Sequence, residues 1–255
     1  MGNLSFELRE FFHLSFLRHL SLRLHGRAYA VKGGICLRFF HRSPRFSQDM
    51  DLDVSPQIGV KTVQNAVDSI LQSRSFLASL IPYGVARVQV VKPKQTETTQ
   101  RWKAGLVLSA QTTLPTKIEL SRRQGKVSYV SGVPDAELLN FYKTAPFAAQ
   151  FYDAIRMTAH KISALASLSR TAARDLFDLH HLLYALLVKR EDVVKIIDQG
   201  AVERAADKTG GFTHRDFKEQ VVPYLTETMM ALYEQPEAFE KLKEEVEQAL
   251  IGMIP

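Results

Sequence analysis

Hydrophobic and polar residues follow helical spacing in some segments and strand spacing in others, which predicts an α+β fold. Residues 3–25 are expected to form one or two helices. After Pro56, apolar residues recur at positions i, i+3, i+4, i+7 and i+8 and predict an amphipathic helix; they are Val63, Ala66, Val67, Ile70 and Leu71. Strand patterns occur at residues 85–91, 106–109 and 117–120, with polar residues 92–103 joining the first two. A turn at Gln124–Gly125 predicts one more strand at residues 126–130, and together these strands predict a small mixed sheet.

The second half of the chain has a helical pattern, with no strand signal after about residue 136. A buried stripe is predicted along one helix, and it leaves Lys161 off its centre; its members are Phe151, Ala154, Ile155, Thr158, Ile162 and Leu165. The next amphipathic helix begins near Arg174 and carries Leu176, Leu179, Leu183 and Leu186. The remaining residues, from 210 onward, predict a helical bundle with an acidic surface. We therefore expect two domains, at residues 1–135 and 136–255.

Composition is that of a soluble globular protein. The 255 residues are 45% hydrophobic and 24% charged, as in ordinary globular domains. No apolar run is long enough to predict a membrane span, and charged residues interrupt the N-terminal apolar stretch where a signal peptide would lie. We expect a cytoplasmic protein with no membrane partner. The single cysteine, Cys36, lies in an apolar stretch and is expected to be a buried structural thiol.

Positive charge is concentrated near the N-terminus. The first 48 residues contain eight Arg and Lys against two Glu, so they account for the whole net charge of +6. Basic residues in this position suit a polyanionic substrate, either a nucleoside triphosphate or a nucleic-acid backbone. The alternative is a solvated helix face with no partner.

Three aspartates at every second position follow this basic segment: Asp49, Asp51 and Asp53. On a strand they would stand on one face, where their mutual repulsion favours a bound divalent cation such as Mg²⁺. The alternative is a solvated strand edge with the intervening apolar residues turned inward. Shortly before them, Gly33 and Gly34 precede an apolar run and predict a turn that opens a short helix and presents backbone N–H groups to a phosphate.

Four segments resemble the motifs of a known family. Residues 32–38 match KGG-x-x-LR, residues 45–53 match RFS-x-D-h-D-L-D, residues 159–165 resemble AEK-h-x-AL, and residues 174–179 resemble RDLYDL. These motifs are those of AbiEii/AbiGii-type nucleotidyltransferase toxins, which are DNA polymerase β-like enzymes usually encoded beside an antitoxin. The resemblance implies a polymerase β-like nucleotidyltransferase core with a small mixed sheet, followed by a helical C-terminal domain that completes the active site. One position departs from the pattern, because His160 stands where the family has glutamate.

The resemblance also implies roles for individual residues. Asp49 and Asp51 would hold one or two Mg²⁺ ions, and Lys161 would contact the triphosphate. Gly33, Gly34 and Ser47 would bind the nucleotide, with Ser47 beside the transferred phosphate or itself accepting a nucleotide. Asp175 would be an active-site residue, supported by Asp53, Arg174 and Asp178.

Two of these assignments leave alternatives open from the residues alone. Glu119 is expected as a third carboxylate, either a metal ligand or a base, but it can equally form a cross-strand ion pair beside Lys117, and Asp53 competes for the third place. Arg174 and Asp178 lie four residues apart and can form an intrahelical ion pair. The adjacent His180 and His181 offer too few ligands for a zinc site.

By resemblance, the chain is expected to be a Mg²⁺-dependent toxin of a toxin–antitoxin or abortive-infection system. It would transfer nucleotides from a nucleoside triphosphate to an acceptor, with the 3′ end of tRNA as the first choice. A protein acceptor is one alternative. A non-catalytic nucleotide- or nucleic-acid-binding module of the same fold is the other. A cognate antitoxin is the expected protein partner.

Overall fold

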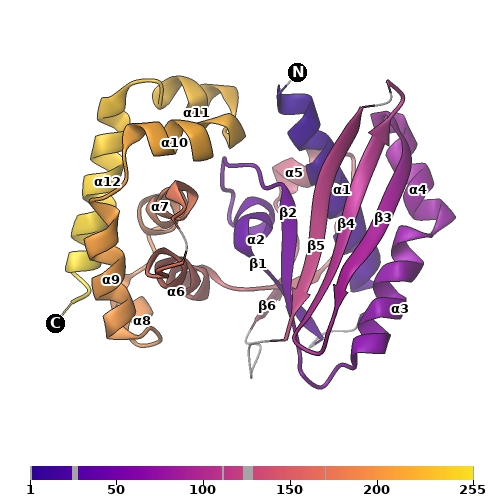
Figure 1. Ribbon diagram of the computed structural model, residues 1–255, viewed down its shortest axis with the longest axis horizontal. Coiled ribbons are helices and arrows are strands. Elements are labelled where there is room, and N and C mark those ends of the chain that lie inside the picture. The colour runs from indigo at the N-terminus through magenta and orange to yellow at the C-terminus, as the bar shows by residue number, and fades with distance from the viewer. Residues whose placement is uncertain (1, 25–27, 111, 123–128, 170, 255) are drawn as a thin grey trace. The chain divides into compact units, whose positions relative to one another are not determined.

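A seven-stranded mixed sheet forms the core of the first of two units in the computed structural model (Figure 1). The structure describes residues 2–24, 28–110, 112–122, 129–169 and 171–254. The first unit comprises Met1–Arg42 and Phe46–Tyr152, and the second comprises Ser43–Arg45 and Asp153–Pro255. The sheet confirms the predicted α+β class.

The strand order of the sheet is β3-β4-β5-β2-β1-β7-β6. β2 pairs in parallel with β5, and β1 pairs in parallel with β7, while the other neighbours are antiparallel. The strands are β1 (Tyr29–Lys32), β2 (Asp49–Val54), β3 (Val85–Gln95), β4 (Thr99–Leu108), β5 (Thr113–Ser121), β6 (Val130–Gly132) and β7 (Ala149–Phe151). β2 therefore lies in the middle of the sheet, between β5 and β1.

Apolar residues of the central strands are buried on one face of the sheet. Met50 and Leu52 of β2 and Ile118 and Leu120 of β5 are fully buried, and residues between them point the other way. Helices α1 (Gly2–Ser21), α3 (Val60–Leu71) and α4 (Arg74–Leu80) pack together beside the sheet (Figure 1). The unit also contains α2 (Gly33–Phe40), a short 3₁₀ helix (Ile81–Tyr83) and α5 (Ala136–Phe141). The helix predicted after Pro56 is confirmed as α3.

Two neighbouring strands are longer than their hydrophobic patterns predict. The polar segment 92–103 lies mostly within β3 and β4, and only residues 96–98 separate these strands. The reason is that β3 is an edge strand whose side chains are mostly solvent-exposed, so polar residues such as Lys94 and Arg101 pair across the hairpin without entering a core.

The predicted turn at Gln124–Gly125 and most of the strand after it fall outside the described residues. β6 begins only at Val130 and pairs with β7.

The sheet continues past residue 135, where the sequence pattern places the end of the first domain. β7 lies beside β1, with Phe151 opposite Val31, and the first unit ends at Tyr152. The expectation of no strand after residue 136 is therefore wrong. A three-residue strand is too short to display alternation. Phe151, expected in a helical stripe, lies in β7 instead and stacks on Phe40 at 4.0 Å between ring centroids.

The second unit is helical, as predicted. Its elements are α6 (Ala154–Leu165), α7 (Ala173–His180), a π-helical turn (His181–Ala185), α8 (Arg190–Val194), α9 (Gln199–Thr209), α10 (His214–Gln220), a 3₁₀ helix (Val222–Tyr224), α11 (Glu227–Leu232) and α12 (Pro236–Ile251). Ile162, Leu176, Phe217 and Phe239 are fully buried in its apolar core. Across the described part of the chain, no helix has the length and apolar character needed to span a membrane.

A buried histidine joins α1 to the two central strands. His13 Nε2 lies 2.8 Å from Thr116 Oγ1, and the Thr116 hydroxyl donates to the carbonyl of Gln48 at 2.7 Å. Because a hydroxyl has only one proton, His13 must be the donor to Thr116 and carries a proton on Nε2. Burial, with a smaller contribution from Arg9, lowers the pKa of His13 to about 3.

This pKa predicts a specific pH dependence of stability. Unfolded His13 takes up a proton near its ordinary pKa of 6.5, whereas the folded protein resists protonation down to about pH 3. His13 therefore costs stability as pH falls through this window, at up to about 1.4 kcal/mol per pH unit. In urea titrations, His13→Gln should show a shallower loss of unfolding free energy between these pH values than the unmutated protein. Identical slopes would contradict the buried neutral state.

Candidate active site

A glycine with a left-handed backbone connects β1 to α2. Gly33 has φ +68°, and a Cβ atom at this position would lie 3.3 Å from Asp51 Oδ2. Both the backbone conformation and the close approach of the carboxylate therefore favour glycine. The sequence prediction of a Gly33–Gly34 turn that opens a helix is confirmed, since α2 begins at Gly33 directly after β1.

Strand register brings three of the predicted carboxylates together. Asp49 lies opposite Lys117, and Asp51 lies opposite Glu119 on the neighbouring parallel strand. On the other side of β2, Asp51 lies opposite Lys32. The side chains of Asp49, Asp51 and Glu119 are partly exposed, at 42%, 38% and 22% respectively. We call these three residues the carboxylate cluster.

Asp53 belongs to the same face of β2 but is not part of the carboxylate cluster. Its side chain is 0% exposed. Lys32 Nζ lies 2.5 Å from Asp53 Oδ1, and the Tyr152 hydroxyl donates to Asp53 Oδ2 at 2.9 Å. Because both carboxylate oxygens are held by partners within the unit, Asp53 is not placed to receive a ligand. Of the two candidates for a third carboxylate, the geometry favours Glu119.

Basic side chains surround the carboxylate cluster. Lys117 Nζ lies 3.4 Å from Asp49 Oδ2, 4.0 Å from Asp51 Oδ1 and 3.8 Å from Glu119 Oε2. Arg101 donates to Glu119 through Nε at 2.7 Å, with its Nη2 at 2.6 Å from the same oxygen. The cross-strand ion pair that the sequence offered as an alternative for Glu119 is therefore present.

The pKa of Asp51 reflects its burial and the charged side chains around it. Desolvation is the largest influence and raises the pKa of Asp51, and the negative charges of Asp49 and Glu119 act in the same direction. Lys117 and Lys32 lower the pKa of Asp51 but do not offset these effects. A raised carboxyl pKa means that the ionised form lacks compensation, which an additional cation would provide.

The carboxylate cluster has the ligand chemistry of a Mg²⁺ site. Mg²⁺ in phosphoryl-transfer sites binds one or two carboxylates and completes its coordination with water and phosphate oxygens. Asp49 and Asp51 supply such a pair. Among the described residues, no three Asp, Glu, His or Cys side chains are already arranged as ligands around one point. The Lys117 ammonium, rather than an open coordination space, lies among the carboxylates.

Among the described residues, His180 and His181 belong to no group of three potential metal ligands, and His180 contacts Glu245 at 2.8 Å.

Ser47 lies just before β2 and contributes to its start. Its hydroxyl donates to the carbonyl of Asp49 at 3.1 Å. This contact holds Ser47 next to the first residue of the carboxylate cluster.

A second group of predicted residues forms a buried ionic cluster within the helical unit. Lys161 Nζ on α6 lies 2.9 Å from Asp175 Oδ1 and 2.6 Å from Asp178 Oδ2, both on α7. Arg45 donates to Asp178 twice, through Nε at 2.9 Å and Nη2 at 2.8 Å. All four side chains are buried, and Lys161 retains only 8% exposure. We call these four residues the buried ion cluster.

The charges of the buried ion cluster stabilise one another. Burial alone would raise the pKa of Asp178, but Arg45 and Lys161 outweigh it and hold that pKa well below its usual range. The pKa of Arg45 is correspondingly raised by Asp178, against the effect of burial. The cluster therefore pairs two basic side chains with two acidic ones.

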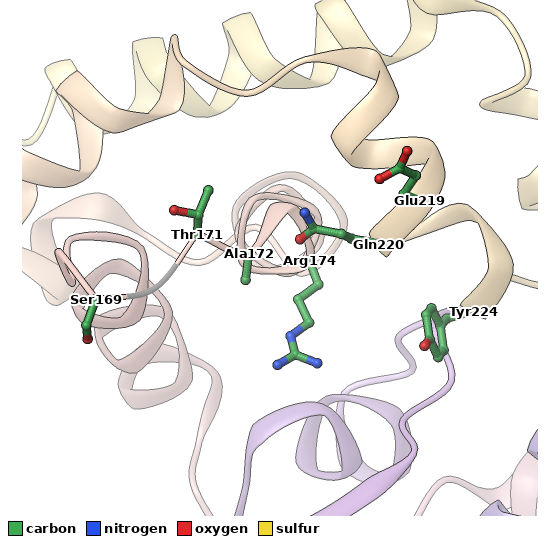
Figure 2. A pocket seen from close by; sticks show the side chains of 7 residues that line it. All are labelled: Ser169, Thr171, Ala172, Arg174, Glu219, Gln220 and Tyr224. Atoms are coloured by element: carbon green, nitrogen blue, oxygen red, sulfur yellow. The ribbon is translucent and has the colours of Figure 1, made fainter.

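Arg174 lies apart from the buried ion cluster, although it is next to Asp175 in sequence. Its side chain lines an open pocket of about 480 Å³ (Figure 2), together with Ser169, Thr171, Ala172, Glu219, Gln220 and Tyr224. The intrahelical Arg174–Asp178 ion pair offered by the sequence is not formed, because both Asp178 oxygens are engaged by Arg45 and Lys161. Gln220 Oε1 accepts a hydrogen bond from the Ala173 N–H at 3.0 Å and so provides a partner for the first backbone N–H group of α7.

Four residues without a role predicted from the sequence hold predicted site residues in place. Lys32 and Tyr152 fix Asp53, Arg101 fixes Glu119, and Arg45 fixes Asp178. Lys32 and Arg45 do lie within the matched motifs, so their motif positions were an available signal. Tyr152 and Arg101 carry no such signal.

Comparison with known proteins provides a family match and fold relatives. The family model described as "Nucleotidyl transferase AbiEii toxin, Type IV TA system" matches residues 15–252. JHP933 from Helicobacter pylori has a similar structure, with a TM-score of 0.54, 20% identity, and coverage of 96% of this chain and 92% of that chain. MenT4, a nucleotidyltransferase toxin from Mycobacterium tuberculosis H37Rv, superposes with a TM-score of 0.61 and 14% identity over 98% of this chain and 94% of that chain. No match is found among curated protein sequences.

The buried ion cluster predicts unequal effects of two neighbouring substitutions. Asp178→Asn removes the anion shared by Arg45 and Lys161 and leaves excess buried positive charge, which should cost about 3–5 kcal/mol of unfolding free energy. Arg174→Gln, at an exposed position on the same helix, should change it by less than about 0.5 kcal/mol. Urea unfolding of the two variants measures both values, and equal losses would contradict the assignment of Asp178 to the cluster.

Proposed function

Because the chain belongs to the AbiEii family of nucleotidyltransferase toxins from type IV toxin–antitoxin systems, we propose that its reaction depends on Mg²⁺ and takes place at the carboxylate cluster. The observation that carries this proposal is the parallel pairing of β2 with β5, which sets Asp51 beside Glu119 and next to Asp49 on an accessible face of the sheet. A nucleoside triphosphate is the nucleotide donor, and a cognate antitoxin is the partner that membership of a toxin–antitoxin system implies.

Asp49 and Asp51 are the proposed metal ligands. Bound Mg²⁺ would supply Lewis-acid stabilisation of the charge that develops on the phosphates. Glu119 either completes the ligands or takes the proton from the attacking hydroxyl, and Arg101 holds it in place for both roles. Gly33 keeps the start of α2 free of side-chain atoms beside Asp51, which leaves room for phosphate oxygens at backbone N–H groups of Gly33 and Gly34. Ser47 is proposed to contact the transferred phosphate.

Lys161 is the proposed contact to the triphosphate from the helical unit. An ammonium has three N–H donors, and Asp175 and Asp178 account for two of them. Among the described residues, the third has no assigned acceptor, and a phosphate oxygen would satisfy it. In this proposal Asp175 and Asp178 hold the lysine side chain in position, and Arg45 in turn holds Asp178.

The reaction is a transfer of a nucleoside monophosphate group. A hydroxyl of the acceptor attacks the α-phosphorus, a new P–O bond forms, and the bond to the β-phosphate oxygen breaks so that pyrophosphate leaves. We propose the 3′ end of tRNA as the acceptor. Exposed basic side chains of the N-terminal segment support this choice, because positive charge on the surface suits a nucleic-acid backbone; they include Arg18, Arg23 and Arg42.

The test uses purified protein, total tRNA and each α-³²P-labelled nucleoside triphosphate in turn, with Mg²⁺ or with EDTA. Asp51→Asn should reduce label transfer at least about 100-fold, because it removes a carboxylate that counters the metal charge. Asp207→Asn, at an exposed aspartate on α9, is the matched control and should transfer normally. Label on protein rather than on tRNA would replace the RNA acceptor with a protein one. Equal transfer by Asp51→Asn, or transfer in EDTA, would overturn the metal site.

A further inference from the structure

Lys117 occupies the centre of the carboxylate cluster. Its Nζ atom lies within 4.0 Å of oxygen atoms from Asp49, Asp51 and Glu119. The lysine projects from the same strand as Glu119, two residues earlier, so both side chains stand on the same face of β5. An ammonium at this place stabilises the same negative charges that a bound divalent cation would stabilise.

The surrounding ion pairs show that Lys117 is the principal counter-charge for the two aspartates. Lys32 is engaged by Asp53 at 2.5 Å, and Arg101 is engaged by Glu119 at 2.6 Å. Among the described residues, the remaining ion-pair partner of Asp49 and Asp51 is Lys117, which both aspartates share. One positive charge therefore serves two carboxylates, and the raised pKa of Asp51 is consistent with this shortfall.

We infer that Lys117 is a resident counter-cation of the metal site, and that it competes with divalent cations until a nucleoside triphosphate arrives. The inference rests on the proposed function, because it assumes that Asp49 and Asp51 bind the metal. A cation that binds both aspartates would be a near neighbour of the Lys117 ammonium, which lies 3.4 Å and 4.0 Å from their carboxylate oxygens, and would be repelled by it. The triphosphate brings negative charge, which gives Lys117 an alternative partner and removes the repulsion.

Competition by Lys117 makes metal affinity depend on the nucleotide. In the free protein, the ammonium neutralises the aspartates and metal binding is weak. With the triphosphate present, the lysine can pair with phosphate oxygens while the metal takes the carboxylates. Metal and nucleotide then bind with positive cooperativity, each raising the affinity for the other by the same factor.

Mn²⁺ binding to the full chain, followed by electron paramagnetic resonance of the free ion, tests this inference without any turnover. Without nucleotide, Lys117→Met should bind Mn²⁺ at least about tenfold more tightly than the unmutated protein, because a like charge next to the ligands has been removed. Lys117→Arg keeps the charge and should behave like the unmutated protein. Adding a non-hydrolysable nucleoside triphosphate should tighten Mn²⁺ binding strongly in the unmutated protein and much less in Lys117→Met.

Lys103→Met is the matched control. Lys103 lies directly opposite Lys117 in the β4–β5 register and is exposed, so this variant removes the same charge from the neighbouring strand. Its Mn²⁺ affinity should stay within about threefold of the unmutated value, since the charge it removes is exposed and screened by solvent. If both lysine variants bound Mn²⁺ more tightly by the same factor, the effect would come from net charge and not from the position of Lys117, which would overturn its specific role.

Two further outcomes separate this inference from the proposed function. If Mn²⁺ binds in an Asp51-dependent manner but Lys117→Met leaves its affinity unchanged or weaker, the counter-cation role is wrong and the metal site stands. If no variant binds Mn²⁺ with or without nucleotide, the metal site itself is wrong, and the role of Lys117 fails with it. Thermal unfolding of Lys117→Arg and Lys117→Met confirms that each comparison is made on folded protein.

Discussion

Repulsion between carboxylates in the middle of the sheet is the constraint that organises the first unit. Strands β2 and β5 place Asp49, Asp51, Asp53 and Glu119 on one face at adjacent positions. Like charges at such spacing destabilise a sheet unless cations offset them. The neighbouring strands and Lys117 supply those cations, and they supply them unevenly. Asp53 and Glu119 each have a dedicated partner, whereas Asp49 and Asp51 share one. The shortage of positive charge falls on the two residues proposed to bind a metal.

The buried ion cluster of the helical unit differs from the carboxylate cluster in both charge balance and burial. Its two cations and two anions balance, and its side chains are almost inaccessible to water. Burying an unbalanced set would be costly, so the cluster is stable only when all members are present and correctly oriented. Such a cluster fixes the orientation of α6 and α7 and holds the Lys161 ammonium in one place. The carboxylate cluster is partly exposed and its charges do not balance, and this imbalance leaves it able to bind a cation.

Local periodicity in the sequence predicted the elements but not the partners of their side chains. β2, the Gly33 turn and α3 each show their pattern within a few residues, so they were predictable. Asp51 lies beside Glu119 because β2 pairs in parallel with a strand more than sixty residues later in the chain, which no local pattern indicates. Arg45 and Asp178 are 133 residues apart in sequence and still form a buried ion pair. The burial of Asp53 depends on Tyr152, which follows a three-residue strand without a recognisable pattern.

Because a lysine lies within the carboxylate cluster, folding of the sheet does not depend on a bound metal. If a metal were the only counter-charge available to Asp49 and Asp51, the sheet would be stable only in its presence, as in small metal-dependent domains. Lys117 provides a covalently attached counter-charge, so the repulsion is already reduced in the metal-free protein. The free energy of metal binding becomes less favourable by the same amount, because Lys117 already offsets part of the repulsion between the carboxylates that a bound metal would relieve. Nucleotide binding, which gives the lysine another anion to contact, restores the metal affinity at the moment when the metal is needed for transfer.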